Sequence, residues 1–266
     1  MMLGLSLSLV GNRLLDGLDP DAAVFIAASG ATEVQAINDF VVQIKNENLW
    51  PFLRCWPMRA GQNAGTGATV YGLGGYSLDN GTLVNTPLWQ TNGVQFLSAS
   101  TQYMTIPISS FNTTYAIGFA VTMLTNGLAG SCIMACNGTS NMDSMQINDA
   151  PSSVLTGGHR QVAASTYVSP SNQSFTNGTP LFGIQGWDAT NVRRGDDGAY
   201  VTVASNAFGG AITPMRINSR GDAVFVGQNK RCAFAMMLVG NGGSQLQYES
   251  IRTIYKATLG LGLGLP

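Results

Sequence analysis

Trp187 and the polar side chains around it are the strongest candidate in the sequence for contact with a carbohydrate. In the stretch FGIQGWDATNV, Gln185, Asp188 and Asn191 all lie within four residues of this tryptophan. An indole face can stack on the apolar face of a sugar ring, while amide and carboxylate groups bond to the ring hydroxyls. The alternative interpretation is a core tryptophan, since most of an indole ring is buried in an average protein.

The acidic residues do not form the pair that glucanases need, which is two carboxyl groups facing each other across a cleft. The chain has three glutamates, all expected in or beside helices: Glu33, Glu47 and Glu249. Asp196 and Asp197 are adjacent in a predicted turn, where aspartate is a common turn residue. The single histidine, His159, lies in a polar loop or at a strand start. We therefore expect no enzymatic activity.

Metal and cofactor sites are not predicted. Asp143, Asn148 and Asp149 could supply some of the oxygen ligands of a calcium ion, but their spacing is not that of a calcium loop. The four cysteines form no C-x-x-C pair and lie far from the histidine in sequence: Cys55, Cys132, Cys136 and Cys232. On one strand, Cys132 and Cys136 would be roughly 13 Å apart, too far for a disulfide. We expect free thiols.

The composition narrows the classes of partner. The chain has 266 residues, of which 45% are hydrophobic and 10% charged, and the formal net charge is -1. No basic run is present, which argues against nucleic-acid binding through phosphates. No apolar stretch reaches the roughly 18 residues that a membrane span needs, and the start lacks the basic region of a signal peptide. A surface rich in Asn, Gln, Ser, Thr and Gly is typical of proteins packed against copies of themselves.

Two regions have helical patterns. Asp19, Pro20 and Gly30 predict the N-cap, first turn and end of one short helix. Thr32 and Gln35 predict a capping box for a second helix. The second helix would bury residues at helical spacing: Val34, Ile37, Phe40, Val41 and Ile44. A final helix is expected from Ser244 to Gly260, with one face made of Tyr248, Ile251 and Tyr255.

Most of the remaining chain has the pattern of short strands separated by turns. In YAIGFAVTML, large residues from Tyr115 to Met123 alternate with small ones, as in a central strand of a sandwich. CAFAMMLVG predicts a second such strand, with Cys232 and Phe234 on one face and Ala233 on the other. Residues 191–205 predict a hairpin with its turn at 195–198.

The expected organisation is mainly β: an antiparallel jelly-roll β-sandwich with a small N-terminal helical subdomain and a short C-terminal helix. Residues 1–59 would hold an N-terminal strand and the helical pair. Residues 60–85 would form a loop rich in Gly and Asn, and residues 86–266 the sandwich.

Both ends of the chain alternate leucine with glycine or serine. The period of two predicts strands with leucines on one face, and we interpret these leucines as assembly elements: Leu3, Leu5, Leu7, Leu9, Leu259, Leu261, Leu263 and Leu265. The alternative is that both strands pack within their own subunit.

The stretch TPLWQTNGVQFLSASTQYMTIP, followed by YAIGFAVTML, resembles the entry and central strand of concanavalin A-like, laminin G-like jelly rolls. Residues 225–260 resemble the closing strands and short helix of that family. Residues 14–50 are similar to segments that precede such domains in bacteriophage virion proteins.

This resemblance implies a non-enzymatic structural protein of a bacteriophage virion, such as a decoration, fibre or baseplate component. Its partners would be other virion proteins and copies of itself, for example in a trimer. The alternative is a carbohydrate-binding module that recognises a host glycan, and the least favoured option is a glycan-cleaving enzyme.

Overall fold

The structure of the protein is a computed structural model. It describes residues 17–76, 78–107, 114–125, 131–137, 144–150, 154–160, 167–168, 173–187, 191–196, 199–204, 214–219, 229–241 and 243–266. The leucines from Leu3 to Leu9 lie outside these residues. Within them, no helix is long and apolar enough to cross a membrane.

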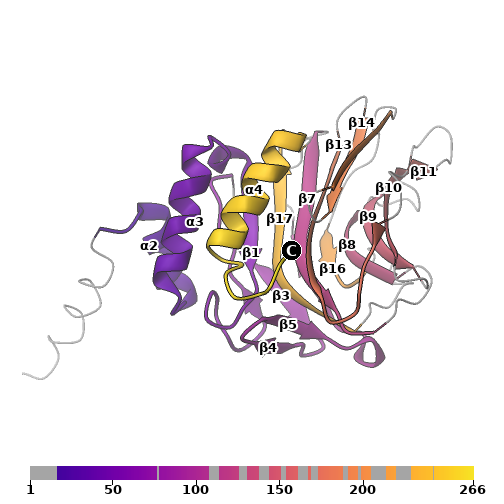
Figure 1. Ribbon diagram of the computed structural model, residues 1–266. Coiled ribbons are helices and arrows are strands. Elements are labelled where there is room, and N and C mark those ends of the chain that lie inside the picture. Colours follow the sequence, from indigo (N-terminus) through magenta and orange to yellow (C-terminus); the bar gives the residue numbers. More distant parts are fainter. Residues whose placement is uncertain are drawn as a thin grey trace, which may run out of the picture.

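Two antiparallel sheets face each other in a jelly-roll β-sandwich (Figure 1). Sheet A has the order β15-β14-β13-β7-β17-β5-β4, and β1 also pairs with β17. Its strands are β1 (Leu53–Pro57), β4 (Leu88–Gln90), β5 (Gly93–Phe96), β7 (Tyr115–Met123), β13 (Pro180–Trp187), β14 (Asn191–Asp196), β15 (Ala199–Ala204) and β17 (Lys230–Val239).

Sheet B has the order β11-β10-β9-β8-β16-β6-β3-β2, and β12 also pairs with β10. Its strands are β2 (Thr69–Val70), β3 (Gly81–Val84), β6 (Tyr103–Ile106), β8 (Ser131–Asn137), β9 (Ser144–Ala150), β10 (Val154–Arg160), β11 (Tyr167–Val168), β12 (Gln173–Ser174) and β16 (Met215–Ile217). The fold class expected from the sequence is confirmed.

Strand β7 shows why the sandwich forms from this sequence. Its large side chains, from Tyr115 to Met123, are buried in the core between the two sheets. Its small ones, Ala116 and Ala120, face the opposite way, into a second core beneath the helices. The alternation expected from the sequence is confirmed, and the small residues allow helices to pack closely on the outer face of sheet A.

Strand β17 departs from the simple alternation that its sequence predicts. Its register against β7 shifts between Cys232 and Phe234, so Ala233 is an extra residue in a β-bulge. Cys232 therefore lies in the core between the sheets, whereas Phe234 lies beneath the helices. The expectation that both share one face is wrong. The bulge falls where β17 changes partner from β5 to β1.

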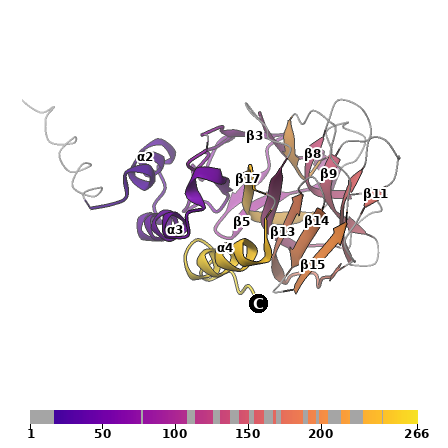
Figure 2. The ribbon, with the colours of Figure 1, turned by 90° about the horizontal axis from the view of Figure 1, so that it is seen from above.

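Three helices cover the outer face of sheet A (Figure 2): α2 (Pro20–Ser29), α3 (Val34–Asn46) and α4 (Gln245–Ala257). The Asp19 side chain caps α2, and Gly30 ends it with a left-handed backbone, as predicted. Ser244 and Gln247 form a capping box on α4. This helix ends at Ala257, earlier than the expected Gly260.

The capping box expected for α3 is wrong. Glu33 is the N-cap residue and its side chain makes no cap bond. The Thr32 hydroxyl instead donates to the Gly61 carbonyl at 3.4 Å, and the amides of Thr32 and Glu33 donate to the same oxygen. A contact from a distant loop thus replaces the local cap.

The sandwich begins earlier in the chain than residue 86. After a single 3-10 turn, η1 (Trp50–Phe52), strand β1 is buried along its whole length beside β17. Residues 60–85 contain β2 and β3, which extend sheet B at its edge, so this segment is not a continuous loop. Later, β14 continues to Asp196, so Gly195 and Asp196 are strand residues rather than turn residues.

Candidate functional site

A cleft opens where the edges of the two sheets meet. It has a volume of about 590 Å³, within the range of small-molecule sites. We call it the Trp89 cleft. Its lining residues come from the loop before β2, from β3, from the β3–β4 turn and from β4: Gly65, Gly67, Ala68, Leu83, Asn85, Thr86, Pro87, Leu88 and Trp89.

Trp89 is held in a fixed position in this cleft. Its backbone pairs with Val94 in the neighbouring strand β5. Its indole packs partly against the core between the sheets, and its Nε1 donates to the Gly67 carbonyl at 3.0 Å. Because its backbone and its indole nitrogen are both held, the Trp89 side chain loses little conformational entropy when a ligand stacks on it.

The turn beside Trp89 has an unusual backbone. Asn85 and Thr86 both have positive φ angles, 61° and 54°. Such a conformation is uncommon for a β-branched residue, and Thr86 also precedes Pro87, which disfavours helical backbone angles. Strain of this kind costs of order 1–3 kcal/mol and collects at binding sites.

The side chain of Gln102 holds this strained turn in place through hydrogen bonds. The Gln102 side chain is buried, and its Nε2 donates to the carbonyls of Asn85 and Thr86, each at 3.0 Å. Its Oε1 accepts the Leu97 amide at 2.7 Å. From the side, Asn85 Nδ2 donates to the carbonyl and hydroxyl of Thr101. The turn is therefore rigid although it is exposed.

The cleft combines an apolar floor with a polar rim. Trp89 and the exposed Leu88 present apolar surface, while the exposed Asn85 and Thr86 present an amide oxygen and a hydroxyl group. A ligand that has one apolar face and several hydroxyls matches this arrangement. None of the lining residues is acidic or a histidine.

The structure describes only some of the residues that the sequence predicts as a carbohydrate site around Trp187. Trp187 ends β13, where its backbone pairs with Tyr115 and Val192, and Asn191 begins β14. Asp188 lies outside the described residues. Gln185 is completely buried, and its amide has no hydrogen-bond partner among the described residues. Gln185 therefore does not reach a surface ligand, and the remaining residues of that group stay a prediction.

The three glutamates lie where the sequence predicts. Glu33 and Glu47 flank α3, and Glu249 lies within α4. His159 is in the strand β10 rather than in a loop. Of the calcium candidates, Asn148 and Asp149 belong to β9 and Asp143 lies outside the described residues. Within the described part of the chain, no group of three or more His, Cys, Asp or Glu residues is placed to hold a metal ion.

Two of the four cysteines are described with their side chains, and both are free thiols, as predicted. Burial raises the pKa of Cys232 to about 12 and that of Cys55 well above its usual range. Both thiols are therefore protonated and unreactive at neutral pH. Cys132 and Cys136 lie on β8 and form part of its backbone pairing.

The C-terminal leucines do not form a strand. Gly262 and Gly264 have positive φ angles of 82° and 72°, and the amides of Leu261 and Leu263 bond back to Thr258 and Gly260 as in turns. Glycine favours this conformation, which a strand cannot contain. The prediction from period two is therefore wrong here. Leu259 is buried, Leu263 and Leu265 pack partly on the helical core, and Leu261 is 67% exposed.

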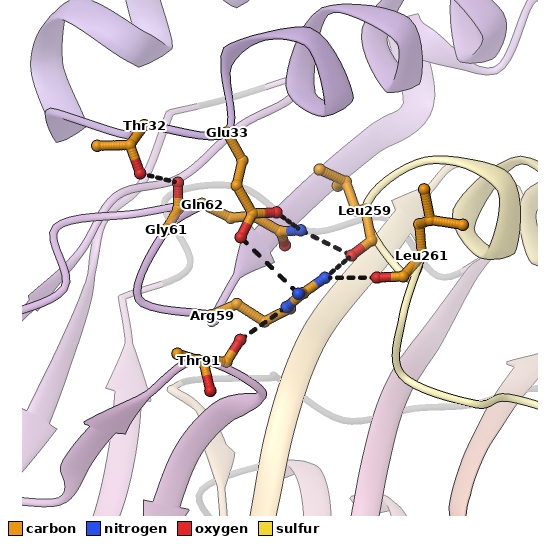
Figure 3. Close-up of polar contacts among 8 residues, drawn as sticks. All are labelled: Thr32, Glu33, Arg59, Gly61, Gln62, Thr91, Leu259 and Leu261. Carbon is orange, nitrogen blue, oxygen red and sulfur yellow. Dashed lines mark hydrogen bonds and ion pairs between the residues drawn. The ribbon is translucent and has the colours of Figure 1, made fainter.

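A polar cluster fixes this C-terminal segment (Figure 3). Arg59 Nη1 donates to the carbonyls of Leu259 and Leu261 at 2.9 and 3.0 Å, and its Nε donates to the Thr91 carbonyl at 2.8 Å. Gln62 Nε2 donates to the Leu259 carbonyl and to Glu33 Oε2, at 2.7 and 2.8 Å. The cluster joins residues about 200 positions apart and has a structural role.

No protein-family model matches this chain, and no curated protein matches it in sequence. Solved structures do match its fold. Trypanosoma rangeli sialidase in complex with sialic acid aligns at 12% identity with a TM-score of 0.58, over 86% of this chain and 40% of the sialidase.

Botulinum neurotoxin domains match as well. Type C, which depends on two ganglioside molecules to enter cells, aligns at 11% identity with a TM-score of 0.57, over 79% of this chain and 53% of that one. The serotype D binding domain aligns at 12% identity with a TM-score of 0.51, over 68% and 49%. The chain thus spans two-fifths to about half of these proteins. At such identities the comparisons show that it shares their lectin-like jelly-roll β-sandwich fold.

Proposed function

We propose that the protein is a non-enzymatic, carbohydrate-binding component of a bacteriophage particle, built on a lectin-like jelly roll. The observation that carries the carbohydrate part is the Trp89 cleft, in which a fixed indole lies beside exposed amide and hydroxyl groups. Structures with the same fold include a complex with sialic acid and a protein that uses gangliosides. The ligand class is a hydroxyl-rich sugar, a host surface glycan on the particle's target cell.

The absence of acidic groups in the described lining supports binding without turnover. Most glycoside hydrolases use two carboxyl groups, one on each side of the scissile bond. The Trp89 cleft is lined by apolar, amide and hydroxyl side chains together with glycines. A bound glycan would therefore be released unchanged.

The structural role on a phage particle rests on the sequence resemblance and on the low charge of the chain, 10% of its residues. In this role, the partners of the chain would be other copies of itself and other virion proteins, and its location would be the virion. The C-terminal leucines remain its proposed assembly elements, although only Leu261 among them is largely exposed. Mass spectrometry of purified particles tests this role, since the chain should be present in a fixed number of copies.

A glycan array tests the binding function. The wild-type protein should retain at least one glycan class, Trp89→Ala should lose it, and Trp89→Phe should keep part of the signal because a ring remains. Loss of one aromatic stacking contact is expected to weaken binding by about tenfold or more. Tyr76→Ala is the matched control, because Tyr76 is an exposed aromatic residue that does not line this cleft.

Two outcomes would overturn the proposal. One is an array on which no glycan binds the wild-type protein. The other is recovery of shortened glycan after incubation, which would show turnover. Circular dichroism of each variant verifies that the fold is retained.

A further inference from the structure

A second depression lies between α2, η1 and the glycine-containing loop before β3. We call it the Val24 groove. It has a volume of about 510 Å³. Its lining residues are Asp21, Val24, Phe25, Ala28, Trp50, Pro51, Leu73, Gly74, Gly75, Tyr76 and Leu78.

The surface of the Val24 groove is apolar and unusually exposed. Val24 is 59% exposed and Leu78 is 58% exposed. Exposed apolar residues that gather in one depression indicate a docking surface. The single acidic residue in the lining, Asp21, is neutralised by Lys45 at 2.6 Å.

Two aromatic residues of this groove, Tyr76 and Trp50, each lie next to a cationic side chain. The Arg54 guanidinium lies 4.6 Å from the centre of the Tyr76 ring, and Lys45 Nζ lies 5.4 Å from the centre of the Trp50 ring. Arg54 is buried and forms an ion pair with Asp79 at 3.0 Å. The groove is thus preformed, and it offers apolar surface with little polar chemistry.

The N-terminal segment of the chain has the matching chemistry. Leu3, Leu5, Leu7 and Leu9 alternate with glycine and serine, and no charged side chain occurs before Arg13. An extended segment would therefore present four leucines on one face, with small residues on the other.

The segment also has the necessary reach. Asp21 lines the groove and lies only four residues after Gly17, the first described residue. The nine residues from Leu9 to Gly17 can span about 26 Å, whereas the whole of α2 is about 15 Å long. The pair Gly11–Asn12 supplies residues that favour a reversal of the chain.

We propose that the Val24 groove binds the leucine-alternating segment Leu3–Leu9 of the same chain. Removal of leucine and groove surface from water drives the contact. The direct connection through α2 gives the segment a high effective concentration at its own groove. This proposal is independent of carbohydrate binding.

Hydrogen–deuterium exchange of the full-length chain tests the proposal. Backbone amides of residues 3–9 should exchange at least about tenfold more slowly than in a free peptide of the same sequence, because a docked segment exchanges only when it opens. Val24→Asp should abolish this protection. Val42→Asp is the matched control, because Val42 is a partly exposed helical valine outside the groove, and it should leave the protection unchanged.

A second pair of variants tests the segment itself. Leu5→Asp should remove the protection, whereas Ser6→Asn, on the alternate face, should retain it. Exchange as fast as that of the free peptide, or protection that survives Val24→Asp, would overturn the proposal. Protection that rises with protein concentration together with the molar mass from light scattering would assign the groove to a second copy, which also contradicts docking within one chain.

Discussion

The Trp89 cleft and the Val24 groove have similar volumes and aromatic walls, but they differ in what surrounds the apolar surface. The cleft has a strained, exposed turn at Asn85 and Thr86, held by buried amide bonds. The groove has no such turn in its described lining, and the charged groups beside its aromatic rings, Lys45 and Arg54, form ion pairs with Asp21 and Asp79. The polar rim, rather than the volume or the aromatic ring, therefore separates a proposed sugar site from a proposed site for an apolar segment.

The largest effect is expected from removing the support of the cleft. Gln102→Ala leaves the Leu97 amide and the carbonyls of Asn85 and Thr86 without this buried partner. We expect the free energy of unfolding to fall by about 2–3 kcal/mol and glycan affinity to fall with it, because the rim is no longer held. Urea denaturation and glycan titration measure the two effects.

The control is Gln90→Ala, which removes a half-buried amide that bonds to Gln95 at 2.6 Å. Its effect on stability should be under about 1 kcal/mol. Equal losses in the two variants would show that Gln102 has no special role in the cleft.

An intermediate effect is expected from relieving the strain. Thr86→Gly allows the positive φ angle of 54° without steric cost, so unfolding should require about 1 kcal/mol more. The same change removes a rim hydroxyl, so glycan binding should weaken although the protein becomes more stable. Thermal unfolding measures the expected gain in stability, and glycan titration measures the expected loss of affinity.

Asn48→Gly serves as the control for this variant. Asn48 also has a positive φ angle, 57°, but it follows α3 and does not line the Trp89 cleft. The Asn48→Gly variant should leave the affinity for glycan unchanged. If Thr86→Gly stabilised the protein and bound glycan as tightly as the wild type, the rim would have no part in recognition.

The smallest effect on stability is expected for the ion pair between Asp19 and Lys45, which joins α2 to α3 and weakens at low pH. Burial opposes ionisation of Asp19, but the hydrogen bond from Lys45 and the backbone amide bonds outweigh it, so the pKa of Asp19 is lowered from 3.8. A lowered folded-state pKa means that the ion pair stabilises the protein above pH 3.8, and that this contribution is lost as the pH falls through the folded-state value.

Asp19→Asn keeps a good N-cap and removes only the charge. It should cost about 0.5–1 kcal/mol at pH 6 and less at pH 2. Asp39→Asn, on the exposed side of α3, should show little difference at either pH. Urea denaturation at both pH values measures the change, and a pH-independent cost would contradict the ion-pair account.

The sequence allows prediction of those elements whose signals are local. Both caps of α2, the N-cap of α4 and the alternation of β7 are confirmed because each depends on neighbouring residues alone. The predictions for the cap of α3 and the faces of β17 are wrong because long-range contacts decide both features. The Gly61 carbonyl replaces the cap of α3, and the change of partner from β5 to β1 accompanies the bulge in β17.

The candidate site is predicted less well, for a similar reason. Trp89 lies in a stretch that resembles a jelly-roll strand, but no neighbouring residue indicates that Gly67, 22 positions away, fixes its ring. One local signal was present: a threonine followed by proline after an asparagine, in NTP, marks a turn. The positive φ angles that make this turn unusual become visible only in the structure.

The most direct test of the central proposal observes the four indole N–H signals by nuclear magnetic resonance during titration with the glycan that binds best. The signals belong to Trp50, Trp56, Trp89 and Trp187, and single Trp→Phe variants assign them. We predict a saturable shift of the Trp89 signal, with those of the buried Trp50 and Trp56 unchanged. A saturable shift confined to Trp187, with Trp89 unaffected, would contradict the proposed site and return recognition to the β13–β14 region.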